Sequence, residues 1–439
     1  MQLIQSGSLR LGIYSDSGKA LGSELMNTSS ETIHTKNETP ARSREADWLR
    51  VRSLLRTYAF NSLAYLSLED DKQWFFSKKV EGVASYAVSG RTMVVCGDPV
   101  CRPEDLPIFI SEILEYAENT HRHLIFLFAL EDYLAAYREA GFGIYKSGEE
   151  AVFSVPSWSM SGGKCAKVRS NYHTAVHHGL TVREYRPYEK RDPEIEREMK
   201  EISAQWFDEK HTSRLQFAVG TMMLDRDCDK RYFYAVDKAG VIQGFHVLNP
   251  YRSGKGWIID IMRRRDGCPH GVMELLFHDE MDVLKKEGAV EASFGIAPLF
   301  NTEDEPHPAA FEKEEHYVFE NMNYIYGFKS LYEAKNKFNP TWKNVYIACS
   351  PRHMSLLMDK DMCTVLDSAG FSDYVRAFAD MLAEEHKEKV EEHKEKVEER
   401  KEKAEERKED KIEEREKKAE ERRSKKAEKR EDRSKSPQK

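Results

Sequence analysis

The hydrophobic pattern has no sustained period before residue 45, and follows helical and strand periods from there to about residue 383. Residues 1–44 are rich in Ser, Thr, Asn and Gly, which predicts a disordered N-terminal segment. In residues 45–160 the pattern predicts a helix, a pair of strands, a second helix, a buried strand, a third helix and a last strand. The ranges are 45–58 for the first helix, 82–88 and 92–96 for the strand pair, then 104–119, 124–130, 132–142 and 151–155.

Residues 161–383 predict a similar order of elements. Two helices, at 193–210 and 215–224, precede a hairpin over 232–249 with the turn Asp237-Lys238-Ala239-Gly240. A strand (256–262), a loop (263–271), a helix (272–288), a strand (292–297) and a closing turn-helix-turn-strand unit (326–348) follow. This order is typical of an α+β fold with two tandem GNAT-like acyltransferase halves, although no residue-level repeat is visible between them.

The tail, residues 384–439, repeats HKEKVEE and close variants every seven residues. Only one small apolar residue falls in each repeat, whereas a coiled coil needs two. Glu–Lys pairs four residues apart instead favour a single solvated helix, each pair adding roughly 0.2–0.5 kcal/mol. We predict a long charged C-terminal helix that acts as a spacer or a weak interaction segment.

Composition limits which partners and which cellular environment fit this chain. The 439 residues carry a net charge of −8, and the tail is close to neutral, so the body is acidic and any nucleic-acid contact needs a local basic patch. Seven scattered cysteines without a CxxC pair indicate reduced thiols in a cytoplasm. No run of eighteen apolar residues and no secretory signal is visible. Neither a metal cluster nor a cofactor motif is seen, so we expect no metal and no cofactor.

The closing unit places cations beside aromatic residues. Lys335 and Lys337 run into Phe338 and Trp342, a combination that suits an anionic, RNA-like or phosphate-bearing substrate. The alternative is a surface helix whose lysines lie over a core tryptophan. Because the two lysines are two positions apart, they point to different sides of a helix, and we predict that Lys337 is the one that faces the site.

Asp260 and Arg263 lie at the end of a predicted buried strand, where a GNAT-like fold opens toward its substrate. The carboxylate could orient an α-amino group, and the guanidinium could hold a phosphate or a carbonyl oxygen. The alternative is a structural ion pair. Arg264 and Gly267 belong to the following loop, which leads into a helix N-terminus and is a second candidate for substrate binding. This loop lacks the glycine pattern with which acetyltransferases bind coenzyme A.

A basic stretch connects the two predicted halves. Lys164, Lys167 and Arg169 precede three histidines, and the spacing predicts a helix that ends at Gly179. Its functional interpretation is a contact with tRNA phosphates, and its alternative is a solvated connecting helix. The turn Gly97-Asp98-Pro99 has a structural interpretation, namely a tight turn that closes a strand.

Five segments, in this order, resemble motifs of one known family. They are NSLAYLSLEDDKQWFF (61–76), VVCGDPV (94–100), IDIMRRR (259–265), SFGIAPL (293–299) and YGFKSLYEAKNKFNPTWKNVYIA (326–348). The family is the phosphatidylglycerol lysyltransferase C-terminal domain, the tRNA-dependent catalytic part of the multiple peptide resistance factors. The resemblance covers residues 48–350. It implies an enzyme that moves an aminoacyl group, such as lysyl, from aminoacyl-tRNA to a lipid hydroxyl such as that of phosphatidylglycerol.

The resemblance also implies that Asp260 and Arg263 match an Asp-x-x-Arg pair implicated in the family's activity. Since no membrane segment is visible, we expect a cytoplasmic protein that meets phospholipid at the membrane surface. Two alternatives stay open at this point. One is a tandem GNAT-like transferase that acts on a peptide or cell-wall amine, and the other is a binding protein without catalysis.

Overall fold

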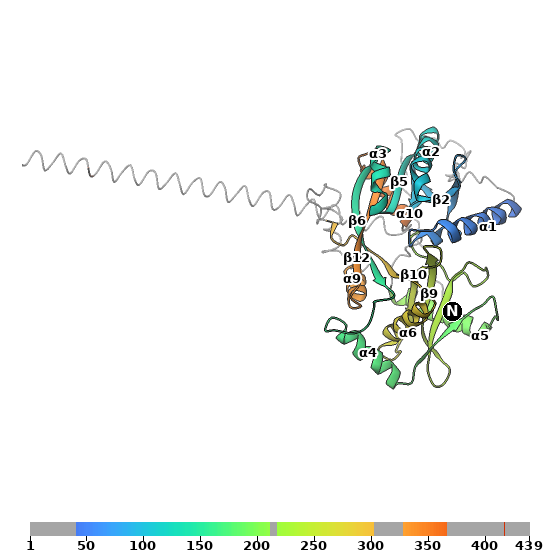
Figure 1. Cartoon of the computed structure of the whole chain (residues 1–439), viewed down its shortest axis with the longest axis vertical. Coiled ribbons are helices and arrows are strands. Elements are labelled where there is room, and N and C mark those ends of the chain that lie inside the picture. Colours follow the sequence, from blue (N-terminus) through green and yellow to red (C-terminus); the bar gives the residue numbers. More distant parts are fainter. Residues whose placement is uncertain (1–40, 211–216, 303–327, 367–416, 418–439) are drawn as a thin grey trace, which may run out of the picture. The chain divides into compact units, whose positions relative to one another are not determined.

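One mixed sheet runs through the part of the chain that the structure describes (Figure 1). The computed structural model describes residues 41–210, 217–302, 328–366 and 417. Its strands are rich in Val, Ile, Phe and Tyr, the residue types that pack well on a pleated surface. The strand order is β1-β2-β3-β5-β12-β6-β11-β10-β9-β8-β7, with β4 paired to β2.

The strands are β1 (Gln73–Phe76), β2 (Gly82–Ser89), β3 (Thr92–Cys96), β4 (Val100–Cys101), β5 (His123–Leu130), β6 (Gly143–Ser154), β7 (Thr181–Tyr185), β8 (Arg231–Val236), β9 (Ile242–Tyr251), β10 (Gly256–Arg264), β11 (Glu291–Pro298) and β12 (Thr341–Ser350). The α-helices are α1 (Ala41–Tyr58), α2 (Leu106–Asn119), α3 (Leu134–Glu139), α4 (Ala166–His177), α5 (Pro193–Lys210), α6 (Val272–Lys286), α9 (Phe328–Asn336) and α10 (Leu356–Leu366). Short 3-10 helices are η1 (Ala64–Leu68), η2 (Pro103–Asp105) and η3 (Glu131–Tyr133).

The last strand, β12, lies between two strands that come much earlier in the chain. It pairs antiparallel with β5 on one side and with β6 on the other. Strand β6 in turn pairs with β11. The strands of the two predicted halves therefore belong to one continuous sheet, and the described residues from Asp47 onward belong to one compact unit.

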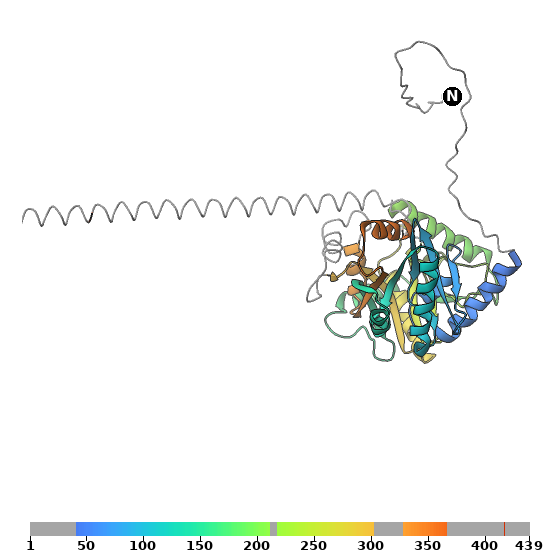
Figure 2. The same ribbon diagram turned by 90° about the horizontal axis from the view of Figure 1, so that it is seen from above.

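Helices cover both faces of the sheet, because the strands carry apolar side chains on both sides. Helices α2, α3 and α6 pack on one face, where Phe126 and Phe277 belong to the buried clusters. Helices α10 and α5 pack on the other face, against Ile347 and Phe245 respectively. Figure 2 shows the orange α10 and the light green α5 along the same side of the sheet.

Two pairs of parallel strands differ in how far they run together. Strands β3 and β5 pair over five residues, from Thr92 opposite His123 onward. Strands β10 and β11 pair over only three residues, ending at Ile258 opposite Ser293. Both strands continue for several residues beyond that point. They therefore separate within the sheet, and we call this separation the β10–β11 opening.

Several sequence predictions are confirmed locally. The turn after Val236 closes with the Gly240 amide donating to the Asp237 carbonyl at 3.1 Å. Helix α4 ends at His177, and Gly179 follows with a left-handed φ of 80°. The helix predicted over 215–224 is wrong for residues 217–224, which form turns and extended chain. The predicted disordered segment up to residue 40 and nearly all of the charged tail lie outside the described residues.

Within the described part of the chain, no helix combines the length and the apolar character that crossing a bilayer requires.

Candidate functional site

Asp260 lies at an irregularity of strand β10. The pairing of β10 with β9 shifts between Ile259 and Ile261, so Asp260 is an extra residue in the strand. Such a bulge turns a side chain away from the regular alternation. The carboxylate is partly exposed and accepts two hydrogen bonds, from the Gly220 amide at 3.3 Å and from Asn249 Nδ2 at 3.1 Å.

A buried ion pair lies beside Asp260. Lys230 Nζ is 2.9 Å from Glu69 Oε1, and the side chains are 0% and 5% exposed. Glu69 also accepts from the Thr221 amide at 2.9 Å and from the Thr221 hydroxyl at 2.7 Å. Lys230 donates to the Thr221 carbonyl at 2.7 Å. A buried pair of this kind is stable only with such additional hydrogen bonds.

The electrostatics of this cluster are coupled. Desolvation raises the pKa of Asp260 above its ordinary value, and the Lys230 ammonium opposes that shift. Burial lowers the pKa of Lys230, but the Glu69 and Asp260 carboxylates outweigh it, so the pKa is raised. The cluster therefore holds two acidic groups and one ammonium, and the unbalanced charge falls on the partly exposed Asp260.

The residues that follow Phe217 form a loop that crosses from one part of the sheet to the other, and we call residues 217–229 the crossing loop. Phe217 packs into the cluster of Ile125 and Val345, while Met222 packs with Tyr232 near α5. At Gly220 the loop approaches Asp260 so closely that a Cβ there would lie 2.0 Å from Asp260 Oδ2. A glycine is therefore required for this contact.

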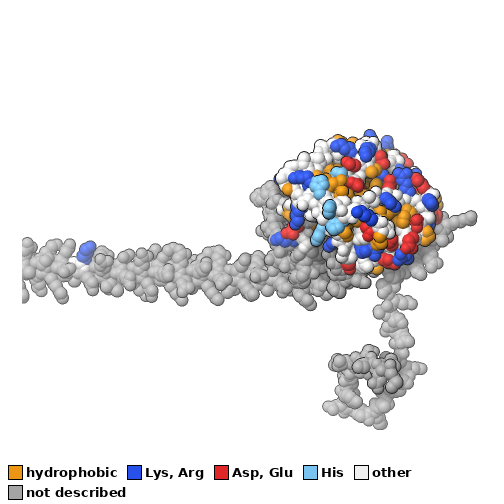
Figure 3. Space-filling model, turned by 90° about the horizontal axis from the view of Figure 1, so that it is seen from below, with side chains coloured by type: hydrophobic (Ala, Val, Ile, Leu, Met, Phe, Trp, Pro, Cys, Tyr) orange, Lys and Arg blue, Asp and Glu red, His pale blue; other side chains and the backbone are white. Residues whose placement is uncertain are grey.

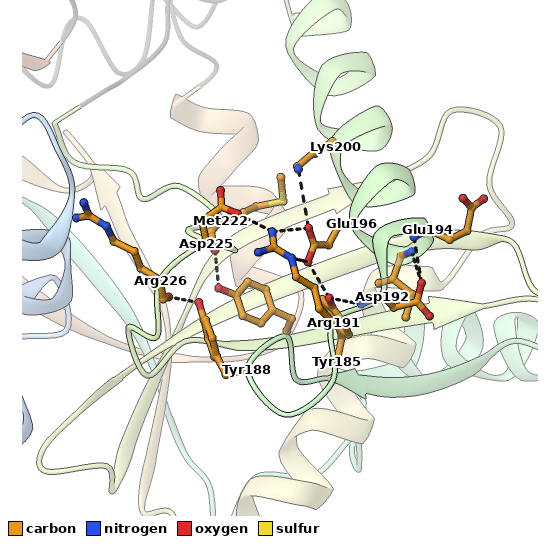
Figure 4. Close-up of polar contacts among 12 residues, drawn as sticks. Tyr185, Tyr188, Arg191, Asp192, Glu194, Glu196, Lys200, Met222, Asp225 and Arg226 are labelled. Carbon is orange, nitrogen blue, oxygen red and sulfur yellow. Dashed lines mark hydrogen bonds and ion pairs between the residues drawn. The ribbon is translucent and has the colours of Figure 1, made fainter.

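A polar network holds the far end of the crossing loop (Figure 4). Arg191 makes two hydrogen bonds to Glu196 and one to Asp225. The Tyr188 hydroxyl donates to the Met223 carbonyl at 2.8 Å and contacts the Arg226 carbonyl. These contacts fix the loop against the start of α5, and so fix the Gly220 and Thr221 amides at Asp260 and Glu69.

Arg263, the second predicted catalytic residue, lies on the same face of the sheet as α5. Its side chain is buried, at 8% exposure, and its guanidinium lies 5.2 Å from the centre of the Trp206 ring on α5. A guanidinium stacked on an indole has a fixed orientation. Within the described residues, Asp260 and Arg263 are not ion-paired to each other, and Asp260 is held instead by Gly220 and Asn249.

Lys335 and Lys337 approach from the opposite face. Helix α9 packs beside β11, and Phe338 contacts Phe277 of α6 with ring centres 5.0 Å apart. Lys337 pairs with Glu274 of α6 at 2.9 Å and keeps about a third of its side chain exposed. Lys335 is 4% exposed and donates to the Ile296 carbonyl of β11 at 2.6 Å. The two lysines point in different directions, as their spacing predicts, and Lys335 is the buried one. The expectation that Lys337 faces the substrate stays a prediction.

The buried position changes the chemistry of Lys335. Desolvation lowers its pKa from 10.5 to about 7, and the nearby Glu150 carboxylate only partly opposes the shift. Glu150 itself is buried on β6 and accepts from the Ser293 hydroxyl at 2.5 Å. Lys335 is therefore an amine that changes charge near neutral pH, next to the strand that borders the β10–β11 opening.

Trp342 belongs to an aromatic group rather than to the buried core. Its ring centre lies 5.1 Å from that of Tyr332 and 5.5 Å from that of Phe300, and its indole nitrogen donates to Asn336 at 3.3 Å. Phe338, by contrast, is 4% exposed within the cluster under α6. The aromatic residues of the closing unit are thus divided. Phe338 belongs to the core, and Trp342 belongs to a partly exposed group near the end of α9.

The loop before α6 is covered by another helix. Arg264 and Gly267 are exposed, and Gly267 adopts a left-handed φ of 67° with open space around it. Gly271, the residue before α6, has a φ of 93°, and a Cβ there would lie 1.9 Å from the Asn171 carbonyl of α4. Helix α4 therefore packs on the N-terminus of α6, the place where a pyrophosphate would need free amides.

The predicted tRNA-contact residues lie around the start of α4. Lys164 and Lys167 are exposed. Arg169 instead donates to the Met160 and Gly162 carbonyls and so fixes the preceding loop. Figure 3 shows the face that carries α4, where histidines lie among lysines and arginines with acidic side chains beyond them. Two of the three predicted cations are thus available to a ligand, and the third has a structural partner.

The predicted residues lie on both faces of the sheet near β10 and β11. Asp260 and Arg263 lie on the α5 face, whereas Lys335 belongs to α9 and Lys337 follows the end of that helix, on the α6 face. Between these faces lies the β10–β11 opening. If the pairing of these strands continued, Asp260 would lie opposite Gly295. A Cβ added at Gly295 would lie 3.4 Å from Ile258 Cδ1, so the Ile258 side chain reaches toward β11 here.

Sequence reasoning missed several members of the site. Glu69 lies within the segment 61–76 but was not singled out there, Lys230 and Asn249 lie outside the five quoted motifs, and Thr221 lies in a segment that was predicted to be helical. One signal was available. Lys230 stands directly before a strand of aromatic and apolar residues, and a charged residue that enters a core needs a partner. The partner is 161 residues away in the chain, so the sequence alone could not identify it.

Comparisons with known proteins show the family to which the chain is related. A sequence model of the family described as phosphatidylglycerol lysyltransferase, C-terminal, matches residues 52–349. The phosphatidylglycerol lysyltransferase of Bacillus subtilis is 27% identical over 308 residues, covering 69% of this chain and 35% of that protein. The corresponding protein of Staphylococcus xylosus is 24% identical, covering 69% and 36%. The chain spans about a third of the length of these curated relatives.

Two solved structures are similar along most of their own length. The C-terminal domain of a putative lysylphosphatidylglycerol synthetase from Agrobacterium fabrum is 26% identical, with a TM-score of 0.63, covering 75% of this chain and 99% of that one. L-PGS from Bacillus licheniformis is 27% identical, with a TM-score of 0.60, covering 68% and 90%.

Proposed function

The chain belongs to the phosphatidylglycerol lysyltransferase C-terminal family, and we propose that it transfers an aminoacyl group from aminoacyl-tRNA to the hydroxyl of phosphatidylglycerol. The observation that carries this proposal is the β10–β11 opening, with Asp260 and Arg263 on one face and Lys335 on the other. An acyl transfer between two large substrates needs a site that both can reach, and an opening through the sheet offers one approach to each.

We also propose that the fold consists of two GNAT-like acyltransferase halves. The connection of hairpin, helix and parallel strand occurs twice, as β2-β3-α2-β5 and as β9-β10-α6-β11. Each unit is followed by a helix and a further strand, β6 or β12. In this proposal the two halves place their last strands side by side in the centre of the sheet.

The transfer itself exchanges one ester for another. The lipid hydroxyl oxygen attacks the ester carbonyl carbon of the aminoacyl group, the carbonyl oxygen takes up negative charge, and the bond to the terminal ribose oxygen of tRNA breaks. The proton of the lipid hydroxyl goes to the departing ribose oxygen, so the reaction is balanced. Because the ester is already activated, positioning and stabilisation of the carbonyl oxygen supply most of the acceleration.

Three side chains have roles in this scheme. Asp260 orients the aminoacyl group through its unbalanced negative charge. Arg263, held on Trp206, provides a fixed cation for the carbonyl oxygen or a phosphate. Lys335 provides a cation on the α6 side at a pH below about 7. Lys337 and Trp342, with Arg264 and Gly267 in the loop before α6, remain candidates for contacts with the rest of the substrates.

Two further features support tRNA as the donor. Helix α4 packs on the N-terminus of α6 at Gly271, so the amides that hold coenzyme A in acetyltransferases have another neighbour here. Lys164 and Lys167 are exposed near the start of the same helix, where they can contact phosphates of an acceptor stem. The lipid acceptor places the protein at a membrane surface during the reaction.

The direct test combines the purified full chain with tRNA charged with labelled amino acids and with lipid vesicles. We expect label to enter the lipid phase with phosphatidylglycerol vesicles and not with phosphatidylethanolamine vesicles. Asp260→Asn serves as the site control, and Gln243→Leu, which breaks an amide–carboxylate contact in the β8–β9 hairpin, serves as a matched variant outside the site. Absence of lipid label with every charged tRNA would contradict the proposal.

A further inference from the structure

Asn249 combines burial with an unused hydrogen-bonding atom. It lies on β9 beside the bulge of β10, and its side chain is 1% exposed. Its Nδ2 donates to Asp260 Oδ2 at 3.1 Å, which fixes the orientation of the carboxamide. Its Oδ1 is buried and has no hydrogen-bond partner among the described residues. A buried amide oxygen without a partner is uncommon and costs roughly 1–3 kcal/mol.

The neighbours of Asn249 show which kind of ligand would satisfy this oxygen. Among the described residues, Asp260 accepts hydrogen bonds from Gly220 and Asn249, and a carboxylate can accept about four. Glu69 accepts three, one from Lys230 and two from Thr221. The Asn249 amide oxygen and part of the Asp260 carboxylate therefore have acceptor capacity left, on two side chains joined by a hydrogen bond, and a positively charged donor would suit both.

We propose that Asn249 Oδ1 and the Asp260 carboxylate together bind the protonated amine of the aminoacyl group. An ammonium has three N–H donors, so one group can reach both acceptors and compensate the unbalanced charge of the cluster. The Gly220 backbone covers one side of Asp260, and the partly exposed side remains for the ligand. This inference rests on the proposed function, and it identifies Asn249 as a binding residue for the substrate amine.

Two amines of a lysyl group could occupy this location. The α-amine is present in every aminoacyl ester, whereas the side-chain amine belongs to lysyl and similar groups only. Both offer the same chemistry to Asn249 and Asp260. The structure indicates that a protonated amine binds here. Probes that carry one amine, both or neither show which of the two amines it is.

The test uses four small amides and the full chain. L-lysinamide carries both amines, L-norleucinamide only the α-amine, 6-aminohexanamide only the terminal amine, and hexanamide neither. Binding is measured by titration calorimetry at a pH below the pKa of the amines. We expect the wild type to bind at least one amine-bearing probe roughly tenfold or more tightly than hexanamide, since hydrogen bonds to charged groups are the strong ones.

The variant Asn249→Leu should lose that preference for amines, and Asn249→Ser, which keeps a small acceptor, should lose less. Gln243→Leu serves as the control for removing an amide that contacts a carboxylate elsewhere. Equal preference for amines in the wild type and in a folded Asn249→Leu variant would overturn the inference. Norleucinamide and 6-aminohexanamide separate the two sources of the amine.

A second measurement needs no variant. In the wild type, the side-chain amide resonance of Asn249 should shift when an amine probe is added and stay unchanged with hexanamide. An unchanged resonance with every amine probe would overturn the inference even if Asn249→Leu fails to fold. If lipid aminoacylation is observed while this resonance does not respond, the role of Asn249 is wrong and the proposed function stands. If the resonance responds while no lipid is labelled, the proposed acceptor is wrong.

Discussion

The two parallel strand pairs of the sheet carry an aspartate at comparable places, and the two aspartates have opposite surroundings. Asp98 follows β3, which stays paired with β5 up to its own last residue, Cys96. It is 4% exposed and accepts from Asn61 Nδ2 at 2.8 Å, from the Leu130 amide at 3.1 Å and from the Tyr137 hydroxyl at 2.9 Å. Asp260 lies where β10 and β11 separate.

The difference separates a structural carboxylate from a candidate functional one. Neutral donors from three elements surround Asp98, so it closes the turn after β3, in agreement with the structural interpretation of the Gly-Asp-Pro motif. Asp260 keeps unused acceptor capacity, lies beside a buried ion pair, and borders an opening. Asp98 thus follows a strand that stays paired to its end, whereas Asp260 lies just beyond the point where the pairing of β10 and β11 stops.

The largest effect is expected from the ion pair beside Asp260. Lys230→Met leaves Glu69 buried without its cation, and breaking such a pair typically costs about 3–5 kcal/mol of the free energy of unfolding. The double variant Glu69→Gln/Lys230→Met should recover part of that loss. Urea denaturation of the single and double variants measures both values. A loss below about 1 kcal/mol in the single variant would mean that the pair does not support the site.

The next largest effect concerns activity. Gly220→Ala places a Cβ 2.0 Å from Asp260 Oδ2, so the carboxylate or the crossing loop must move. A displacement of about 1 Å at a reacting group can cost about 100-fold in rate, and we expect a loss of that size in kcat/KM for lipid aminoacylation. The measurement compares initial rates of lipid aminoacylation under conditions in which both proteins are folded.

Gly97→Ala is the matched variant in the other strand pair. Its φ is 70°, and an added Cβ would lie 3.1 Å from the Asn61 side chain. We expect a stability loss of roughly 1–2 kcal/mol from the left-handed backbone with little change in kcat/KM. If Gly97→Ala lowers the rate as much as Gly220→Ala does, the distinction between the two strand pairs is wrong.

A separate effect, visible only when the pH is varied, is a pH dependence of stability that belongs to Asp98. Burial raises its pKa from 3.8 to about 6, although Asn61, Leu130 and Tyr137 oppose the shift. The folded state therefore binds this proton more tightly than the unfolded state does. The corresponding stability is present below pH 4 and is lost as the pH rises through 6.

Asp98→Asn removes this titration. Relative to the wild type, the variant should gain about 2–3 kcal/mol of unfolding free energy between pH 4 and pH 7. Denaturation curves at several pH values measure the difference. A difference between the two proteins that does not change with pH would show that Asp98 is ionised throughout, and its surroundings would then resemble those of a substrate-binding carboxylate.

The sequence predicted the features that depend on neighbouring residues. The Asp237–Gly240 turn and the end of α4 before Gly179 follow from local spacing and turn chemistry. Asp260 lies on the predicted strand, but at a bulge in the middle of β10 and not at its end. The missed features depend on distant residues. Nothing local indicates that Glu69 pairs with Lys230, that β12 lies between β5 and β6, or that residues 217–224 cross the sheet instead of forming a helix.

Lys335 in α9 and Lys337 just after it show that even neighbouring residues can depend on tertiary packing. Spacing places Lys335 and Lys337 on different sides of a helix, but only the packing of α9 beside β11 and α6 decides which side is inside. That packing buries Lys335 at the Ile296 carbonyl and leaves Lys337 to Glu274. The family resemblance suggested the candidate site residues, and the tertiary structure shows what surrounds each of them.

The most direct test of the account compares lipid aminoacylation by the wild type, Asp260→Asn and Asp98→Asn in one assay with charged tRNA and phosphatidylglycerol vesicles. We predict that Asp260→Asn lowers kcat/KM by about 100-fold or more, while Asp98→Asn changes it by no more than about threefold. A folded Asp260→Asn variant that transfers as fast as the wild type would contradict the assignment of the β10–β11 opening as the site of transfer.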